Sequence, residues 1–211
     1  MIPAYSESYL EDAIRNLGEA LDYAVNACHI SADEFFSLFV STRFAERFEK
    51  CEPKVIVGLS GTELVLDVFA KAGLAIPDAK PIIDFECSPE YWCGYILAYC
   101  QWATGKSFSD IHKAITAEEI LKMYPTLHEA PEDKFVDVVN AIFARKQGPT
   151  KLQQKRKVCG YSQSELAKKA SVNLRTLQQY ETRAKNINKA SVKTVETLAI
   201  VLGCRIEDLL D

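Results

Sequence analysis

The sequence lacks the features of a membrane protein, a secreted protein or a disulfide-bonded fold. No basic start followed by an apolar run occurs at the beginning, so we expect no secretory signal. The most apolar stretch, Tyr91 to Ala103, is about a dozen residues long, whereas a membrane-spanning helix needs roughly 20. The seven cysteines are scattered and form no CxxC pair, which predicts free thiols in a reducing cytoplasm.

Patterns that carry enzyme or metal chemistry are also missing. Cys87, Cys93, Cys100 and His112 match no zinc spacing, and Cys93 and Cys100, seven residues apart, fit the buried face of a helix. The segment Ser60 to Thr62 has no lysine of the kind that completes a phosphate-binding loop. We therefore expect no enzyme, no cofactor and no metal.

Charge divides the chain into two unlike parts. Residues 150–211 carry 12 Lys and Arg against 6 Asp and Glu, a net charge of +6. Residues 1–149 carry 13 against 23, a net charge of −10. The formal net charge of −4 for the whole chain therefore conceals a basic C-terminal part, which favours a polyanionic partner for that part alone.

Residues 1–147 show helical spacing of apolar residues almost throughout, which predicts an all-α, acidic, regulatory or partner-binding domain. The first helix is expected from Leu10 to Cys28, and the second from a capping box at Ser31 and Glu34 to a break at Pro53. Residues 73–88 are expected to form a loop. The short apolar run 55–57 is a candidate strand to pair with residues 81–85. Further helix starts are expected at Ser60, Ser88, Thr116 and Pro131.

Tyr91, Tyr95 and Tyr99 follow one another at intervals of four residues, with Trp92 and Trp102 nearby. This stripe is compatible with an aromatic ligand pocket. A buried central helix is favoured, because the segment is apolar on nearly every side.

The segment Gln147 to Thr150 is the predicted domain boundary, because Gly148 ends a helix and Pro149 cannot continue one. Five short helices are expected in residues 150–211. They begin at Lys151, after Ser162, after Asn173, after Ser191 and at Ile206. Ser162 and Glu165 have the spacing of a capping box.

Three stretches of this second domain form an ordered pattern: SQSELA at 162–167, VNLRTLQQYE at 172–181 and LAIVLGCRIEDLL at 198–210. Together they resemble the phage-repressor (xenobiotic-response-element, XRE) helix-turn-helix family, over roughly 30% of the chain. The resemblance implies a lambda-repressor-like domain that binds double-stranded DNA, with its second helix in the major groove. It also implies a structural salt bridge between Arg156 and Glu181.

Residue by residue, the resemblance places base contacts on the helix that follows Asn173, since Gln can pair with adenine and Arg with guanine. Ser162 and Asn173 lie at helix N-termini, whose backbone N–H groups can receive phosphates. The basic loop 182–189 is expected to follow the DNA backbone. The implied DNA-binding residues are Ser162, Gln163, Asn173, Leu174, Arg175, Thr176, Gln178, Gln179, Arg183 and Lys185. The turn departs from the family at Ser171, where glycine is common.

These features together predict a sequence-specific transcriptional regulator, a repressor of its own operon that acts as a homodimer. Residues 1–149, with the segment 88–92, resemble N-terminal regions of bacterial regulators of toxin–antitoxin-like operons. The first domain could thus bind a partner protein, dimerise the chain or sense a small molecule. The alternatives are an antitoxin that neutralises a toxin, an enzyme with an appended DNA-binding domain, and a scaffold whose helix-turn-helix binds protein.

Overall fold

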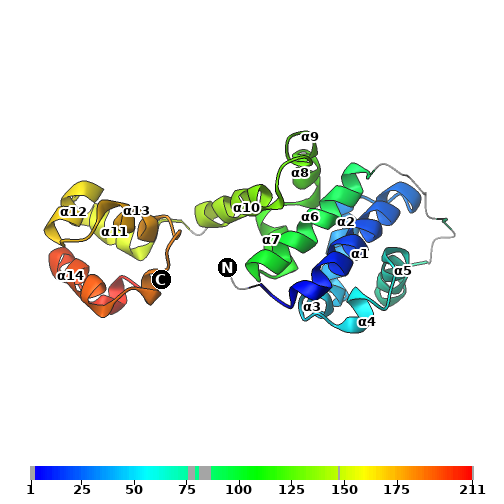
Figure 1. Cartoon of the computed structure of the whole chain (residues 1–211), viewed down its shortest axis with the longest axis horizontal. Coiled ribbons are helices and arrows are strands. Elements are labelled where there is room, and N and C mark those ends of the chain that lie inside the picture. The colour runs from blue at the N-terminus through cyan, green and yellow to red at the C-terminus, as the bar shows by residue number, and fades with distance from the viewer. Residues whose placement is uncertain (1–2, 76–78, 81–86, 147, 211) are drawn as a thin grey trace. The chain divides into compact units, whose positions relative to one another are not determined.

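The computed structural model describes residues 3–75, 79–80, 87–146 and 148–210. Two compact units divide the chain, Met1–Asn140 and Ala141–Asp211, and each is considered by itself. All regular elements in the described ranges are helical, which confirms the all-α class (Figure 1).

The first unit consists of short and medium helices. The 3-10 helix Glu7–Tyr9 precedes α1, and a π-helical turn, Tyr23–Ala27, extends α1 towards Cys28. The α-helices are α1 (Leu10–Asp22), α2 (Ala32–Ser41), α3 (Phe44–Glu49), α4 (Pro53–Ile56), α5 (Gly61–Ala72), α6 (Pro89–Thr104), α7 (Phe108–Ala114), α8 (Ala117–Leu121), α9 (Tyr124–Leu127) and α10 (Glu132–Lys146).

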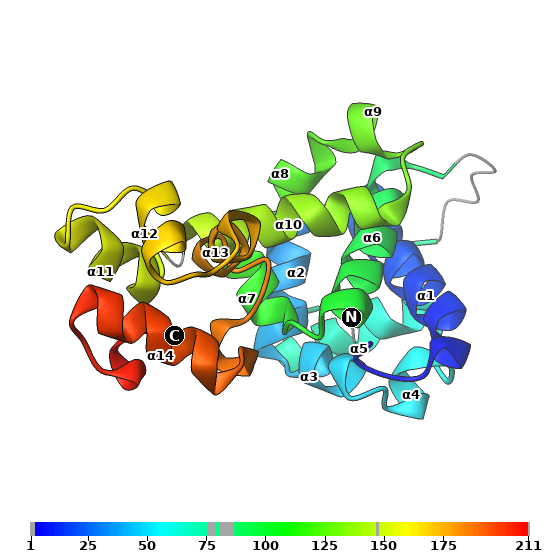
Figure 2. The ribbon, with the colours of Figure 1, turned by 60° about the vertical axis from the view of Figure 1, so that its left-hand side comes forward.

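Helices α1 and α6 lie side by side and form the centre of this unit (Figures 1 and 2). Their backbones approach closely at Gly94, where an added Cβ would lie 2.7 Å from the carbonyl carbon of Leu17. Cys93 and Cys100 are fully buried in α6, as their spacing predicts. Burial raises the pKa of Cys100 to about 12, so its thiol stays protonated. The prediction of a buried central helix is confirmed.

Helix starts are the part of this unit that the sequence predicts best. Capping boxes form at Ser60 with Glu63 and at Thr116 with Glu119, and Ser88 accepts a hydrogen bond from the Tyr91 amide at 2.9 Å. These contacts satisfy amides that have no acceptor within their own helix. The Ser31 hydroxyl accepts from the Glu34 amide and caps α2. Among the described contacts, the reciprocal hydrogen bond of the expected capping box, from the Ser31 amide to the Glu34 side chain, is absent.

Two predictions for residues 31–57 are wrong. The helix from Ser31 to Pro53 is divided into α2 and α3 at Arg43, whose φ of 68° is incompatible with a continuous helix. In place of the strand expected at 55–57, Val55 and Ile56 end α4 and Val57 follows as its cap residue. Pro53 is the first residue of α4, a position at which the helix needs no amide hydrogen. Its proposed partner, residues 81–85, lies outside the described residues.

Helix α7 was not expected from the sequence, and the short helix α9 contains Pro125, where the preceding helix was expected to end. The apolar spacing of α7 extends over only two turns. Its start is nevertheless marked by Ser107, whose hydroxyl accepts from the Asp110 amide at 3.1 Å.

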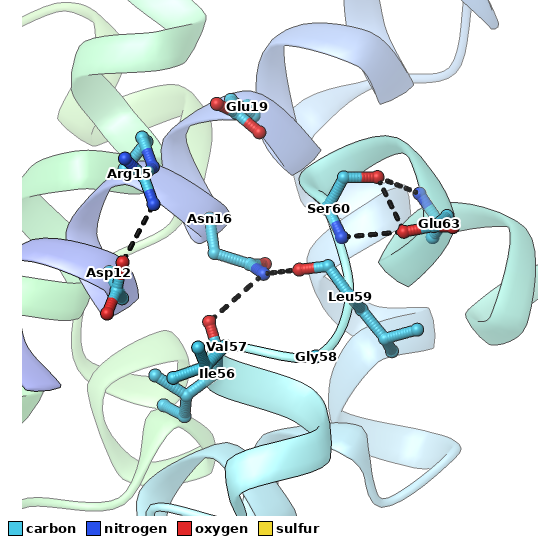
Figure 3. A pocket seen from close by; sticks show the side chains of 10 residues that line it. All are labelled: Asp12, Arg15, Asn16, Glu19, Ile56, Val57, Gly58, Leu59, Ser60 and Glu63. Carbon is cyan, nitrogen blue, oxygen red and sulfur yellow. Dashed lines mark hydrogen bonds and ion pairs between the residues drawn. The ribbon is translucent and has the colours of Figure 1, made fainter.

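The buried side chain of Asn16 ties α1 to the turn between α4 and α5 (Figure 3). Its amide group donates to the carbonyl oxygens of Val55 at 3.3 Å, Ile56 at 3.4 Å and Leu59 at 2.5 Å. The Val55 and Ile56 oxygens lie at the end of the four-residue helix α4 and accept no hydrogen bond within it, and the Leu59 oxygen lies in the turn that follows. A buried polar residue therefore fixes a turn that apolar packing alone would leave free.

The second unit contains the helices expected from the sequence. They are α11 (Lys151–Val158), α12 (Gln163–Lys169), α13 (Leu174–Glu181), α14 (Val192–Leu202) and, as a 3-10 turn, η4 (Ile206–Asp208). A further 3-10 turn, Ile187–Lys189, lies in the basic loop. The core is Leu152, Leu166, Ala167, Ala170, Leu177, Tyr180, Ile187, Val195, Leu198, Ala199, Leu202 and Leu209.

The division between the compact units falls inside α10, between Asn140 and Ala141. The expected boundary lies at the end of the same helix, and it includes Gln147, which is outside the described residues. Thr150 is buried and caps α11 by accepting from the Gln153 amide at 3.1 Å.

Candidate nucleic-acid interface

Helices α12 and α13 are joined by the three-residue turn expected from the sequence. Ser171 has a φ of 54°, in the left-handed region, and the next amide, of Val172, donates to the Ala167 carbonyl at 2.9 Å. This bond closes the end of α12 and sets the direction in which α13 leaves. The family's usual glycine would fit this backbone without strain.

We predict that Ser171→Gly stabilises the second unit by roughly 0.5–1 kcal/mol, since relief of a left-handed φ outweighs the greater freedom of unfolded glycine. Amide hydrogen exchange of residues 162–181 in the full chain measures the change. The matched control is Glu196→Gly, exposed and in the middle of α14, which should lose about 1 kcal/mol. Slower exchange in the control, or faster exchange in Ser171→Gly, contradicts the argument.

Helix α13 turns one side to the core and the other to solvent. Leu177 and Tyr180 are buried. Because successive residues rotate by about 100° around the helix axis, Arg175 and Gln178 point away from that core, and Leu174 lies at the edge between the two sides. All three are exposed, and Leu174 is an apolar side chain with 39% of its surface in solvent. One solvent-facing surface thus holds a cation, an amide and an apolar group.

Gln179 and Thr176 flank this surface and are half-buried. The Gln179 carbonyl accepts from the Lys185 amide at 3.0 Å, which holds the start of the basic loop against the end of α13. The Lys185 ammonium lies 5.7 Å from the centre of the Tyr180 ring. Lys185 is exposed.

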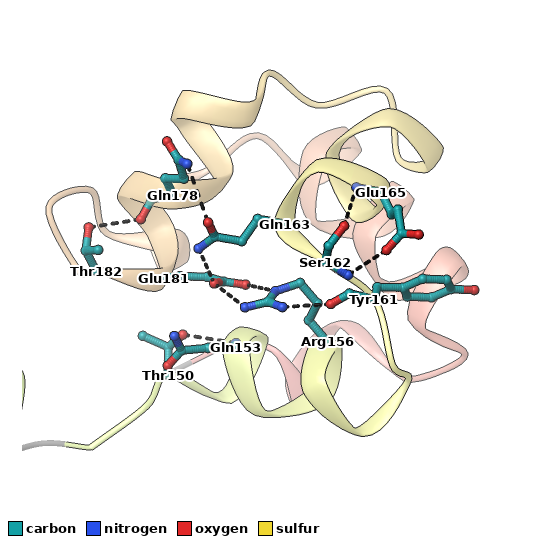
Figure 4. Close-up of polar contacts among 10 residues, drawn as sticks. All are labelled: Thr150, Gln153, Arg156, Tyr161, Ser162, Gln163, Glu165, Gln178, Glu181 and Thr182. Atoms are coloured by element: carbon teal, nitrogen blue, oxygen red, sulfur yellow. Dashed lines mark hydrogen bonds and ion pairs between the residues drawn. The ribbon is translucent and has the colours of Figure 1, made fainter.

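A buried ion pair joins α11 to α13 (Figure 4). The Arg156 guanidinium on α11 donates from Nε to Glu181 Oε1 at 2.6 Å and from Nη2 to Glu181 Oε2 at 2.9 Å. Its Nη1 donates to the Tyr161 carbonyl at 2.7 Å. The two ion-paired side chains are 9% and 0% exposed. The hydrogen bonds to Glu181 raise the pKa of Arg156. The expected salt bridge is present in a bidentate form.

Gln163 at the start of α12 belongs to the same network. Its Nε2 donates to Glu181 Oε2 at 2.8 Å, and its Oε1 accepts from Gln178 Nε2 at 3.4 Å (Figure 4). Gln163 therefore orients Gln178, an exposed residue of α13, in addition to any contact of its own with DNA. The sequence pattern indicates both glutamines but not the bond between them.

The helix N-termini are only partly open to a phosphate. Ser162 and Glu165 form a capping box, and hydrogen bonds from Ser162 lower the pKa of Glu165. Asn173 Oδ1 accepts from the amides of Arg175 at 2.9 Å and of Thr176 at 3.4 Å. In the described part of the chain, the amides that keep no acceptor include those of Gln163 and Leu174, the first residues of α12 and α13. Fewer backbone amides at the starts of α12 and α13 are therefore free to receive a phosphate than the sequence predicts.

The basic loop holds Arg183 differently from the sequence expectation. Its Nη1 donates to the Gly148 carbonyl at 2.7 Å, and the residue is half-buried with a φ of 60°. This contact fixes the segment that precedes α11. A structural role for Arg183 therefore accompanies any contact with the DNA backbone.

The sequence does not reveal the cation–aromatic contact between Lys169 and Tyr161. Lys169 Nζ lies 4.4 Å from the centre of the Tyr161 ring and 3.2 Å from its hydroxyl oxygen. The contact orients an exposed lysine at the end of α12. Spacing alone does not reveal it, because the eight-residue separation spans a turn and a whole helix.

Comparison with known proteins supports the DNA-binding assignment. The family model for helix-turn-helix domains matches residues 152–209. No curated protein and no solved structure matches the chain, and the resemblance of residues 1–149 to toxin–antitoxin regulators gains no support. Across the described ranges, each helix is too short or too polar to cross a membrane. Residues 152–209 are a helix-turn-helix domain of the phage-repressor type, and the chain is a DNA-binding transcriptional regulator.

Proposed function

We propose that this regulator binds a specific double-stranded DNA sequence and represses its own operon. The observation that carries the proposal is the solvent-facing side of α13, where Arg175 and Gln178 are exposed while the opposite side is packed in the core. The residues proposed to contact DNA are those expected from the sequence. Within it, Gln163 and Arg183 have the additional structural contacts described above.

A homodimer is part of the proposal, because one small module contacts only a few base pairs. Two copies would bind half-sites about 10–10.5 bp apart, or a multiple of that spacing. Selection from a random DNA pool with the full chain identifies the operator. A single, unrepeated half-site among the selected sequences, together with a monomeric mass in sedimentation, contradicts the dimer.

We predict that Arg175→Ala weakens binding to the selected operator by about 1–3 kcal/mol and relaxes the preference at one base position. The reason is that a guanidinium recognises guanine through two hydrogen bonds. Titration of the operator and of random DNA with the full chain, at one fixed salt concentration, measures the difference.

The matched control is Lys168→Ala, which removes an exposed cation from the end of α12. Its loss should be similar on operator and random DNA, because a phosphate contact carries no sequence information. An equal loss on both DNAs for Arg175→Ala contradicts its role in base recognition.

For the first unit we propose a regulatory role, in which it binds a partner or a small effector. The antitoxin alternative assigns it a toxin as partner, and the net charge of −10 on residues 1–149 favours a basic surface on such a protein. Co-purification with the product of an adjacent gene, toxic when expressed alone, tests this alternative. Harmless overexpression of every adjacent gene without this chain contradicts it.

A further inference from the structure

A cavity of about 240 Å³ lies in the first unit, between the N-terminal half of α6 and the segment around α9 and the start of α10. It is smaller than the roughly 300–1,000 Å³ of pockets for drug-sized ligands, so it suits a compact molecule with a single ring. The lining residues are Cys87, Tyr91, Trp92, Tyr95, Ile96, His128, Ala130 and Glu132.

Aromatic side chains dominate the wall on the α6 side. Tyr91, Trp92 and Tyr95 all line the cavity, and Trp92 is further fixed by edge contacts with Tyr124, at 5.6 Å between ring centres, and Phe135, at 6.1 Å. Rigid aromatic walls bind apolar rings. Their π systems also attract cations that lie over the ring face.

Among the described residues that line the cavity, Glu132 is the one carboxylate, and none is a lysine or an arginine. The Tyr95 hydroxyl donates to Glu132 Oε1 at 2.8 Å. Burial, followed by this hydrogen bond, raises the pKa of Tyr95 to about 12, so the tyrosine keeps its proton and remains a donor. The carboxylate is thereby held in position with its second oxygen still able to accept.

His128, the other ionisable side chain in the wall apart from the tyrosines and Cys87, is engaged elsewhere. Its Nδ1 lies 2.8 Å from the Tyr124 carbonyl oxygen, to which it donates, and its ring stacks on the Tyr124 ring at 4.5 Å between centres. Its Nε2 lies 3.7 Å from Glu129 Oε1. Of the described lining residues, Glu132 therefore presents the charge to a ligand.

A polar hollow where α1 meets α5 offers less to a ligand (Figure 3). Its charged groups already pair with neighbours: Arg15 with Asp12 at 2.7 Å, and Glu63 with the Ser60 amide at 2.8 Å. The Gly61 amide donates to Glu19 Oε2 at 3.3 Å. These contacts account for the hollow as the junction of α1 with α5.

We propose that the aromatic cavity is an effector site for a small organic cation that carries one aromatic ring, with Glu132 as the counter-charge. The inference rests on the effector role proposed for the first unit. Glu132 begins α10, and this helix continues beyond Asn140 into the residues of the second unit. A ligand on Glu132 thus acts on the element that leads directly to the DNA-binding domain.

Calorimetric titration of the full chain with benzyltrimethylammonium chloride, in the absence of DNA, tests the site. We expect binding of this cation and none of phenylacetate, which has a similar ring but the opposite charge. Only two tryptophans occur in the chain, so the Trp102→Phe variant leaves Trp92 as the single fluorescent tryptophan. Its emission should change as the cation binds.

Glu132→Gln keeps an acceptor for Tyr95 but removes the charge, and should weaken binding of the cation about tenfold, within the range for one charge pair at short distance. Asp133→Asn is the matched control. Asp133 lies on the same turn and accepts from the Tyr99 hydroxyl at 3.1 Å, but it does not line the cavity. The Asp133→Asn variant should bind the cation with the same affinity as the unmodified chain.

No binding of the cation at millimolar concentration overturns the inference, as does equal affinity of Glu132→Gln and the unmodified chain. An equal loss in Asp133→Asn also overturns it, because the effect would then come from general surface charge. None of these results bears on operator binding by α13. Failure of the effector site and failure of the proposed regulator are therefore separate outcomes.

Discussion

Replacing Arg156 with methionine is expected to destabilise the helix-turn-helix domain by about 3–5 kcal/mol, because it leaves the Glu181 carboxylate buried without its counter-charge. Glu181 is 0% exposed in its side chain and receives two of its hydrogen bonds from Arg156. The same change removes the donor to the Tyr161 carbonyl. Gln163 alone cannot replace a bidentate guanidinium.

Hydrogen exchange of amides in residues 150–211 of the full chain measures this loss, since both tryptophans lie in α6 and report on the first unit. Operator binding should fall with it, because Glu181 is the last residue of α13.

The double variant Arg156→Met with Glu181→Leu separates the effect on domain stability from the effect on operator binding. A well-packed apolar pair of similar volume often replaces a buried ion pair with little or no loss of stability. We therefore expect the double variant to recover most of the exchange protection. It should not recover full operator affinity, since Gln163 loses the acceptor that positions it against Gln178. Equal destabilisation in the single and double variants contradicts this account.

Local chemistry explains why helix starts could be predicted from the sequence. A capping box such as Ser60 with Glu63 involves residues three apart, so its geometry is contained in the sequence pattern. The break at Arg43 has no comparable signal, because a non-glycine residue adopts a left-handed φ there and the apolar spacing continues across it. The expectation of a strand at 55–57 is wrong because three residues are too few to distinguish the periods of a strand and a helix.

The sequence predicts the DNA-binding domain in more detail than it predicts the aromatic cavity. A long ordered pattern gave the five helices, the Ser171 turn and the pairing of Arg156 with Glu181. The contact between Tyr95 and Glu132 joins residues 37 apart on two helices, and its existence depends on how α10 packs against α6. The apolar character of the segment on nearly every side indicates that α6 is central, but not which acidic residue Tyr95 meets.

Gly94→Ala is expected to destabilise the first unit by at least about 2 kcal/mol, although alanine in place of glycine ordinarily stabilises a helix by about 1 kcal/mol. The added Cβ would overlap the Leu17 carbonyl group of α1, and it would lie 2.9 Å from the Gly18 Cα. Both obstacles are backbone atoms of a packed helix, so no side-chain rotation relieves them. Helices α1 and α6 would have to separate.

The matched control is Gly18→Ala, on the other side of the same contact. The three atoms nearest to its added Cβ all belong to the Tyr91 ring, at 3.0–3.1 Å, and a side chain at that distance can move by a few tenths of an ångström. The helix-propensity gain of about 1 kcal/mol then offsets the strain, and the stability should change little. Urea unfolding followed by tryptophan fluorescence reports on this unit, because Trp92 and Trp102 both lie in α6. If Gly94→Ala is as stable as Gly18→Ala, the close backbone approach of α1 and α6 cannot be the contact that holds the unit together.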